Sequence, residues 1–171
     1  MDVEASLGYN SLEQMKREDI RTFLKAGTDA IAVYFDSGRL TEFNKLSDKG
    51  FPFAWLESLE VDTDFGGSGG MLIDNWRVSI HIAKLDKFDS RQDKYESIVD
   101  ACDHIARKLI WQYNLILQSA SQITTANQDL YKLVTMSDIR REPFIKKHAD
   151  VLTGVILSFN ITSPDKTDVC P

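Results

Sequence analysis

Apolar and mixed positions alternate near the C-terminal end of the chain, over residues 150–162. One parity is apolar except at Thr153, and its members are Val151, Val155, Leu157, Phe159 and Ile161. The opposite parity is mixed and includes Gly154, Ser158 and Asn160. Because side chains alternate between the two faces of a strand, a period of two predicts a strand with one face on a core. This strand has to join a sheet that other segments supply.

Two segments instead space their apolar residues by three and four, which is typical of amphipathic helices. The longer one covers residues 91–119, and its stripe runs from Tyr95 to Leu117 without a break. The shorter one covers residues 11–26. It begins with S-L-E-Q at Ser11, a capping-box arrangement, and Gly27 is a plausible stop. We expect both helices to pack on the sheet.

A long β-hairpin arm is predicted between the two helices. Residues 51–61 read as one strand, with Pro52 at its beginning because proline lacks an N–H for the ladder. Residues 71–85 read as the other, since Trp76, Val78, Ile80 and Ile82 alternate with polar positions. The glycine-rich stretch 62–70 is then the loop at the tip.

The remaining segments complete the sheet. Residues 30–35 and 40–44 are predicted to form a hairpin around D-S-G-R, with continuation of the first helix as the alternative. Residues 129–136 alternate again, and residues 140–148 predict a strand or an irregular arm. Residues 1–10 and 163–171 are expected to be flexible tails of a single domain, 1–171. The predicted class is α+β, a mostly antiparallel sheet with helices on one face.

Composition limits the class of protein but does not indicate a particular reaction or ligand. The chain has 171 residues, 43% hydrophobic and 27% charged, which is ordinary for one globular domain. A net charge of -6 argues against a broad basic face for gripping nucleic acid, although a local basic patch stays open. Two cysteines do not make a disulfide framework. With no basic, apolar leader and no run of apolar residues long enough to span a bilayer, we expect a soluble protein that folds in a cytoplasm, without a membrane partner.

Candidate catalytic and metal-binding residues are few. Asp62 and Asp64 form a D-x-D beside glycines, but the further ligands of a calcium loop are missing, and a solvated hairpin tip is the simpler interpretation. His81 has no partner histidine at metal-ligand spacing. Cys102 lies on the apolar helix stripe, where an inert buried thiol is expected. We therefore predict no enzyme, cofactor or metal. The alternative is a small α+β enzyme or ligand-binding module using Asp62, Asp64 and His81.

Interaction surfaces are the more promising candidates. The predicted arm tip contains Phe65, Gly66, Gly67, Gly69 and Gly70, and its glycines would let it adapt to a neighbouring subunit. A local basic cluster contains Arg140, Arg141, Lys146 and Lys147, which could face DNA phosphates or an acidic partner; a solvated strand pair is the commoner explanation. The tryptophans Trp55, Trp76 and Trp111 are expected to anchor the core or an interface.

Two blocks of sequence resemble small proteins of tailed-phage structural modules. One block contains S-G-R-L-T-E-F-N, D-K-G-F-P-F-A-W-L-E, W-R-V-S-I-H-I-A-K-L-D and S-R-Q-D-K-Y-E-S-I-V-D-A-C-D-H-I-A-R-K-L. It is similar to proteins of phages and prophages of Bacteroidetes hosts, including crAss-like phages. The other is the ending, A-D-V-L-T-G-V-I-L-S-F-N-I-T-S-P, which is similar to the last strand of siphophage tail terminator and neck-ring proteins. Together they cover residues 29–162.

The resemblance implies a head-to-tail connector, tail terminator or tail completion subunit. Such subunits form closed rings, often of 6 or 12 copies, at the neck or the tail end of the virion. A sheet backed by helices would form the body, and long hairpins would reach neighbouring copies. Portal, neck or tail proteins would be the other partners, and DNA would pass the inner rim. The family has no catalytic residues to carry over.

Overall fold

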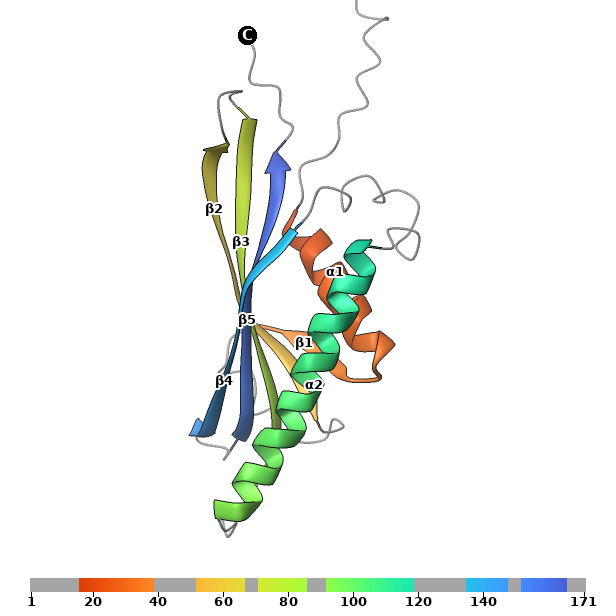
Figure 1. Ribbon diagram of the computed structural model, residues 1–171, viewed down its shortest axis with the longest axis vertical. Helices are drawn as coiled ribbons and strands as arrows, with labels where there is room; N and C mark the ends of the chain where they lie inside the picture. The colour runs from red at the N-terminus through yellow and green to blue at the C-terminus, as the bar shows by residue number, and fades with distance from the viewer. Residues whose placement is uncertain are drawn as a thin grey trace, which may run out of the picture.

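The computed structural model describes residues 16–38, 52–66, 71–85, 92–118, 135–147 and 152–165. In chain order the elements are α1 (Arg17–Ala30), β1 (Tyr34–Ser37), β2 (Phe53–Gly66), β3 (Met71–Leu85), α2 (Gln92–Gln118), β4 (Thr135–Lys147) and β5 (Leu152–Asp165). The strands form one sheet in the order β1-β2-β3-β5-β4. Only the β1–β2 pair is parallel among these neighbours. The predicted α+β class is confirmed, with both helices packed against the sheet (Figure 1).

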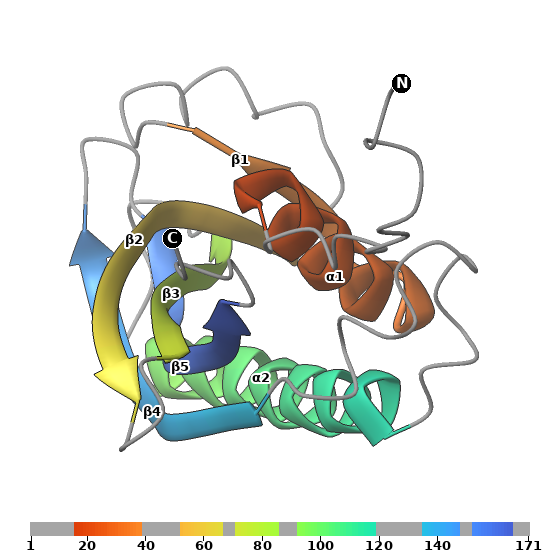
Figure 2. The same cartoon turned by 90° about the horizontal axis from the view of Figure 1, so that it is seen from above.

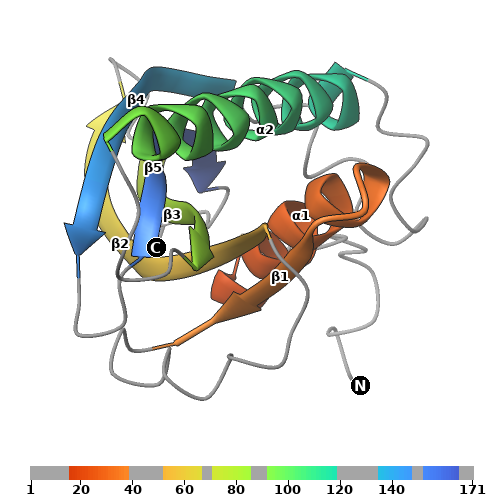
Figure 3. The same cartoon turned by 90° about the horizontal axis from the view of Figure 1, so that it is seen from below.

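The core lies between the helices and one face of β3 and β5. Register places Val78 opposite Phe159 and Ile80 opposite Leu157, and all four side chains are buried. The apolar stripe of α2 packs against them, as its spacing predicts; its buried members include Cys102, Ala106, Leu109, Tyr113 and Ile116. Figures 2 and 3 show β2 bending through a wide arc, with both helices on its inner side.

Contact between the two helices depends on Gly27, which was wrongly predicted to stop the first helix. The glycine lies inside α1, where a Cβ would come within 2.6 Å of Tyr113 Cδ1 on α2. Tyr113 is fully buried, its hydroxyl donates to the Leu24 carbonyl at 3.4 Å, and its ring packs between Phe23 and Phe159. Glycine therefore permits a close helix crossing here.

The helix predicted for residues 11–26 is displaced along the chain. Residues 11–15 lie outside the described part, and α1 begins at Arg17 behind a Lys16 N–H bonded to the Asp19 carboxylate at 2.7 Å. The C-terminus is a Schellman motif, in which the Val33 N–H donates to the Thr28 carbonyl and the Ala32 N–H to Asp29. Ala32 has φ 55°, a left-handed conformation that usually selects glycine.

The strand predicted for residues 30–35, the first half of a hairpin, is confirmed only at Tyr34 and Phe35. Ala30 ends α1, and the strand begins only at Tyr34. This four-residue strand pairs in parallel with the beginning of β2, with Tyr34 opposite Phe53. Residues 40–44 lie outside the described part. The apolar run 30–35 was misread because a short apolar run can close a helix as readily as it can begin a strand.

Other strands are longer than their patterns predicted. Pro52 precedes β2 as expected, but β2 continues to Gly66, so residues 62–66 are strand rather than loop. The last strand continues to Asp165, which pairs with Leu72, so residues 163–165 are not part of a flexible tail. Residues 135–147 form one edge strand, β4, while residues 129–134 and 148 lie outside the described part.

A second, smaller apolar cluster lies on the opposite face of the sheet. It contains Phe53, Trp55, Ala83, Phe144 and Leu152. Gly154 lies beneath it, opposite both Ala83 and Phe144, and a Cβ at this glycine would come within 2.8 Å of Ala83 Cα. The end of the sheet formed by the beginnings of β2 and β5 and the end of β3 is thus buried on both faces, whereas the opposite end is not.

Candidate functional site

The β2–β3 hairpin forms an arm, defined here as residues 60–66 and 71–77. Figure 1 shows it projecting past the ends of both helices, with the end of β5 beside it. At its tip Phe65 is opposite Leu72 and is 80% exposed. Gly66 is the last residue of β2, while Gly67, Gly69 and Gly70 lie outside the described part.

The arm is supported by pairing on both sides of β3. The β3–β5 ladder continues from Leu85–Leu152 to Leu72–Asp165 without a register shift. Thr63 donates to the Asp74 carboxylate across the hairpin at 2.6 Å, and Arg77 pairs with Asp62 at 2.5 Å. Since the Arg77 and Asp62 side chains are more than half exposed, their ion pair adds little stability. The backbone ladder is the main support of the arm.

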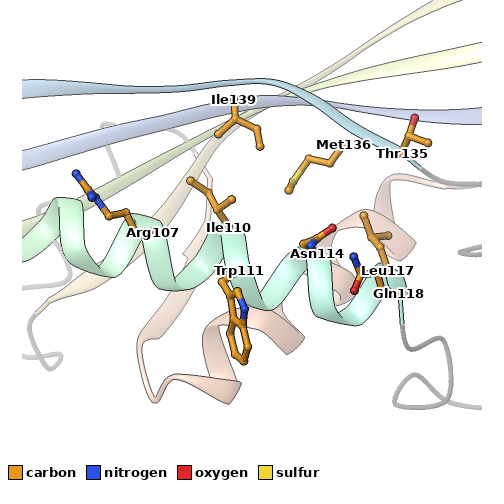
Figure 4. Close-up of a pocket in the computed structure, with 9 residues that line it drawn as sticks. All are labelled: Arg107, Ile110, Trp111, Asn114, Leu117, Gln118, Thr135, Met136 and Ile139. Carbon is orange, nitrogen blue, oxygen red and sulfur yellow. The ribbon is translucent and has the colours of Figure 1, made fainter.

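A second candidate surface is a groove of about 580 Å³ between α2 and the beginning of β4, called the α2–β4 groove. Its lining includes Arg107, Ile110, Trp111, Leu117, Met136 and Ile139. Figure 4 shows Met136 and Ile139 extending from β4 toward α2 and Ile110 pointing up to them, whereas the Trp111 ring projects from α2 in the opposite direction, away from β4. Trp111 is 61% exposed and Ile139 is 41% exposed.

A β-bulge places Ile139 in this groove. Ser137 is opposite Asn160 and Arg140 opposite Ser158, so β4 advances three residues while β5 advances two. Asp138, at φ 51°, occupies the irregularity, and its carboxylate accepts a hydrogen bond from Asn160 Nδ2 at 2.9 Å. A bulge of this kind re-aims the side chains that follow it. Here it turns Ile139 to the helix side of an edge strand.

Charged residues of α2 and β4 lie at the end of the α2–β4 groove that contains Arg107. Asp103 on α2 accepts from Arg107 at 2.8 Å and from Arg141 on β4 at 2.5 Å. One carboxylate therefore serves two guanidinium groups, which leaves an excess of positive charge. Lys108 is exposed one turn before Trp111.

The predicted basic cluster does not form a single basic face. Arg141 is on the helix side, bonded to Asp103, whereas Arg140 is opposite Ser158 on the other face. Lys146 and Lys147 are in β4, but their side chains lie outside the described part, as does His148. Arg140 instead lines a polar groove of about 640 Å³ on the open face, with Arg77, Asp138 and Glu142.

Asp62, Asp64 and His81 do not share a site. Asp62 and Asp64 are on the exposed arm, and Asp62 is opposite Asn75. His81 is six residues further along β3, a separation of about 20 Å at the usual rise per residue. It is 3% exposed in the second apolar cluster, where Nε2 lies 2.5 Å from the Glu57 carboxylate and the ring is 5.6 Å from Phe144.

Glu57 reaches His81 because it is the extra residue of a β-bulge in β2. Leu56 is opposite Ile80 and Ser58 is opposite Ser79, so Glu57 has no rung of its own. Its carboxylate is about one-third exposed while the imidazole is buried. The pair links β2 to β3 at this bulge, and neither aspartate of the arm can reach it.

The buried thiol and phenol of the core are chemically quiet. Desolvation raises the pKa of Cys102 to about 11, partly opposed by the positive charge of Lys84. Burial likewise raises the pKa of Tyr113 far above its usual value. Both groups stay protonated at neutral pH, so Cys102 lacks the thiolate that nucleophilic chemistry requires.

Across the described ranges, no three His, Cys, Asp or Glu side chains gather where they could hold a metal ion. Of the two helices in these ranges, neither is both long and apolar enough to cross a membrane.

Sequence reasoning did not place Trp111 and Ile139 on the surface. Trp111 was assigned to core or interface without a choice between them, and Ile139 was not singled out. The sequence contains one signal for Trp111. It follows Ile110 and therefore lies at the edge of the apolar stripe of α2, where a partner can contact it. Trp55 and Trp76 are buried, at 3% and 5% exposed.

Comparison of the chain with protein-family models gives no match. Comparison with curated proteins gives no match either.

Proposed function

We propose that this chain is a non-enzymatic structural subunit of a tailed-phage virion, forming a ring at the head–tail neck or the tail terminus and joining head to tail. One observation carries the proposal. Within the described part, the large hydrophobic side chains that are exposed are Phe65, Trp111 and Ile139. All three lie on the arm tip or in the α2–β4 groove. Trp111 and Ile139 line one groove, and exposed apolar surface grouped in this way is typical of sites of protein–protein contact, while Phe65 stands alone at the arm tip.

The two surfaces favour a closed assembly because they differ from each other. A contact between unlike surfaces of identical subunits is heterologous, and it generates a ring when the rotation closes. The phage resemblance implies closure at 6 or 12 copies. The same resemblance expects a sheet backed by helices with a long hairpin, and the observed fold has this form.

The edges of the sheet are poorly suited to pairing with a strand of another copy, which favours assembly through side-chain contacts instead. On one side, β1 has only four residues and pairs with β2 from Phe53 to Leu56. Among the described residues, β2 itself forms the edge beyond that point, and it contains the acidic residues Glu60, Asp62 and Asp64. On the other side, β4 has two register shifts, and it contains Pro143 and several charged residues. Bulges, proline and charge on an edge strand all oppose pairing with another chain. Contacts between copies are then left to the arm and the groove.

Under this proposal the partners are further copies of the chain and the neighbouring portal, neck or tail proteins. The chain is made in the host cytoplasm and resides in the virion. Arg140 on the open face, with its polar groove, is the described basic residue best placed to meet DNA phosphates without base specificity.

The test is the mass and shape of the purified full chain. Size-exclusion chromatography with light scattering, over a wide range of protein concentration, should give a species of uniform copy number. Negative-stain imaging of that species should show closed rings. A chain that remains strictly monomeric at the highest concentration contradicts the proposal, and so does an assembly of open, indefinite filaments.

A further inference from the structure

We propose that the arm tip of one copy docks into the α2–β4 groove of the next copy, with Phe65 as the inserted side chain and Trp111 and Ile139 as its receptor. The inference rests on the proposed ring function and specifies the contact that builds it. It assigns a donor surface, a receptor surface and a direction around the ring.

Phe65 is suited to insertion because it is exposed at the end of a supported arm. At 80% exposed, its ring makes little contact within its own chain. The unbroken β3–β5 ladder continues to Leu72, directly opposite Phe65, so the aromatic side chain is presented by a three-stranded platform. A rigid aromatic anchor loses little conformational freedom when it binds, which is why such residues dominate interfaces.

The α2–β4 groove provides a matching receptor. Its volume of about 580 Å³ is open to solvent and is bounded by apolar side chains of two elements. Met136 and Ile110 form its half-buried floor, and Ile139 stands at its β4 margin. Trp111 lines the outer margin on α2, with its ring directed away from β4 (Figure 4). Aromatic pairs and aromatic–aliphatic contacts of this kind bury large areas and are enriched in the centres of interfaces.

Charge selects the arm as the occupant. The arm contains four acidic residues, Glu60, Asp62, Asp64 and Asp74, and one basic residue, Arg77, so its formal charge is 1 − 4 = −3. Arg107 is the charged residue that lines the groove. Arg141 and Asp103 are bonded beside it and Lys108 follows it in α2, so the formal charge of these four residues is 3 − 1 = +2. Opposite potentials steer encounter and fix the register of a contact, and they oppose the pairing of two arms or of two grooves.

The tip belongs to a neighbouring copy because it cannot reach the groove of its own chain. The arm extends past the ends of both helices (Figure 1), and the continuous ladder prevents it from folding back. Each copy therefore offers one tip and receives another. Such a directional contact is heterologous, and it closes into a ring when the rotation between copies closes.

The first experiment removes each surface separately. Phe65→Ser and Trp111→Ala should each weaken self-association by about 30-fold or more, because truncation of an interface hot spot has effects of this size. Glu96→Ala, at an exposed position in the first half of α2 outside the groove, is the matched control and should assemble like the wild type. Both test residues are exposed, so the monomeric variants should keep the wild-type circular dichroism and melting temperature.

The second experiment mixes the two variants. A Phe65→Ser chain keeps an intact groove, and a Trp111→Ala chain keeps an intact tip. Together they can form one complete contact, so native mass spectrometry should show a one-to-one heterodimer and no ring. In a parallel pair, Asp64→Lys and Arg107→Glu should each weaken assembly, and their combination in one chain should restore it.

The outcomes separate the docking from the ring function. If the wild type assembles and the Phe65→Ser or Trp111→Ala variant assembles equally well, the docking is wrong while the ring remains. A mixture of the two variants that stays monomeric also overturns the docking. If the wild type itself is monomeric throughout the concentration range, both the docking and the ring are overturned.

Discussion

Substitution of Gly27 by alanine should destabilise the protein, although alanine is the better helix former. A Cβ at this position would lie 2.6 Å from Tyr113 Cδ1 and still closer to Cε1. Ordinary contact begins at 3.4 Å, so the ring would have to retreat by at least 3.4 − 2.6 = 0.8 Å. Tyr113 has no room to do so, since it is fully buried between Phe23 and Phe159.

Two opposing contributions set the magnitude. Alanine in place of glycine inside a helix favours folding by about 1 kcal/mol. Overpacking a close contact costs about 1–3 kcal/mol, and the upper half of that range applies because the Tyr113 hydroxyl also holds the ring to the Leu24 carbonyl. The cost exceeds the gain, and Gly27→Ala should lower the free energy of unfolding by about 1–2 kcal/mol.

Urea denaturation followed by tryptophan fluorescence, at a protein concentration below assembly, measures this difference. Ala26→Gly, at the exposed neighbouring position of α1, reports the propensity contribution alone and should cost about 1 kcal/mol. Tyr113→Leu removes the obstructing ring atoms, so Gly27→Ala in that background should be neutral or stabilising, a coupling of about 1 kcal/mol or more. A Gly27→Ala chain as stable as the wild type would refute the close-packing argument.

Two further predictions concern the C-terminus of α1 and the buried thiol. Ala32→Gly should raise the free energy of unfolding by about 0.5–1 kcal/mol, because it removes the cost of a left-handed alanine, and a lower melting temperature in calorimetry would contradict this. Burial raises the pKa of Cys102 to about 11 in the folded protein. Below pH 9 the thiol is therefore protonated in both the folded and the unfolded protein, whereas between pH 9 and 11 it ionises only in the unfolded chain. Stability should therefore fall with rising pH in that interval, by up to about 2–3 kcal/mol, and this fall should be smaller in Cys102→Ala. Equal slopes for the two proteins in pH-dependent urea denaturation would show that the thiol is not desolvated.

Regular periodicity made most of the fold predictable. The alternation in β3 and β5 and the stripe of α2 each have a single period sustained over many residues, so they identify the buried faces correctly. The hairpin β2–β3 and the one-sided placement of the helices follow from these faces.

Predictions failed where tertiary contacts override local patterns. Gly27 was taken for a stop because helix-ending glycines are common, while its use as a contact point for Tyr113 depends on a residue 86 positions away (113 − 27). The parallel pairing of the short strand β1 with β2 was not predicted, since no local signal distinguishes a parallel partner from a hairpin partner. Residues 62–66 were assigned to a loop because polar residues there face solvent on both sides of an arm.

The candidate surfaces were only partly predictable for the same reason. The place of Phe65 at an arm tip followed from its position between two strands and a glycine run. The receptor groove did not, because it is made by a β-bulge at Asp138 that turns Ile139 toward α2. A bulge shifts the parity of a strand, and sequence alternation alone does not show where the shift occurs.

Site-directed crosslinking between copies tests the central claim most directly. In a Cys170→Ser background, Leu72→Cys and Asn114→Cys in the same chain would place one reactive thiol on the tip, opposite Phe65, and one in the groove, while Phe65, Trp111 and Ile139 are kept and Cys102 stays buried. A short bismaleimide should then link tip to groove between neighbours, giving a ladder on a denaturing gel that ends at the ring size. Mixing the two single variants should give dimers only. A double variant that yields only monomers, under conditions where a control thiol at Glu96 reacts, would contradict the account.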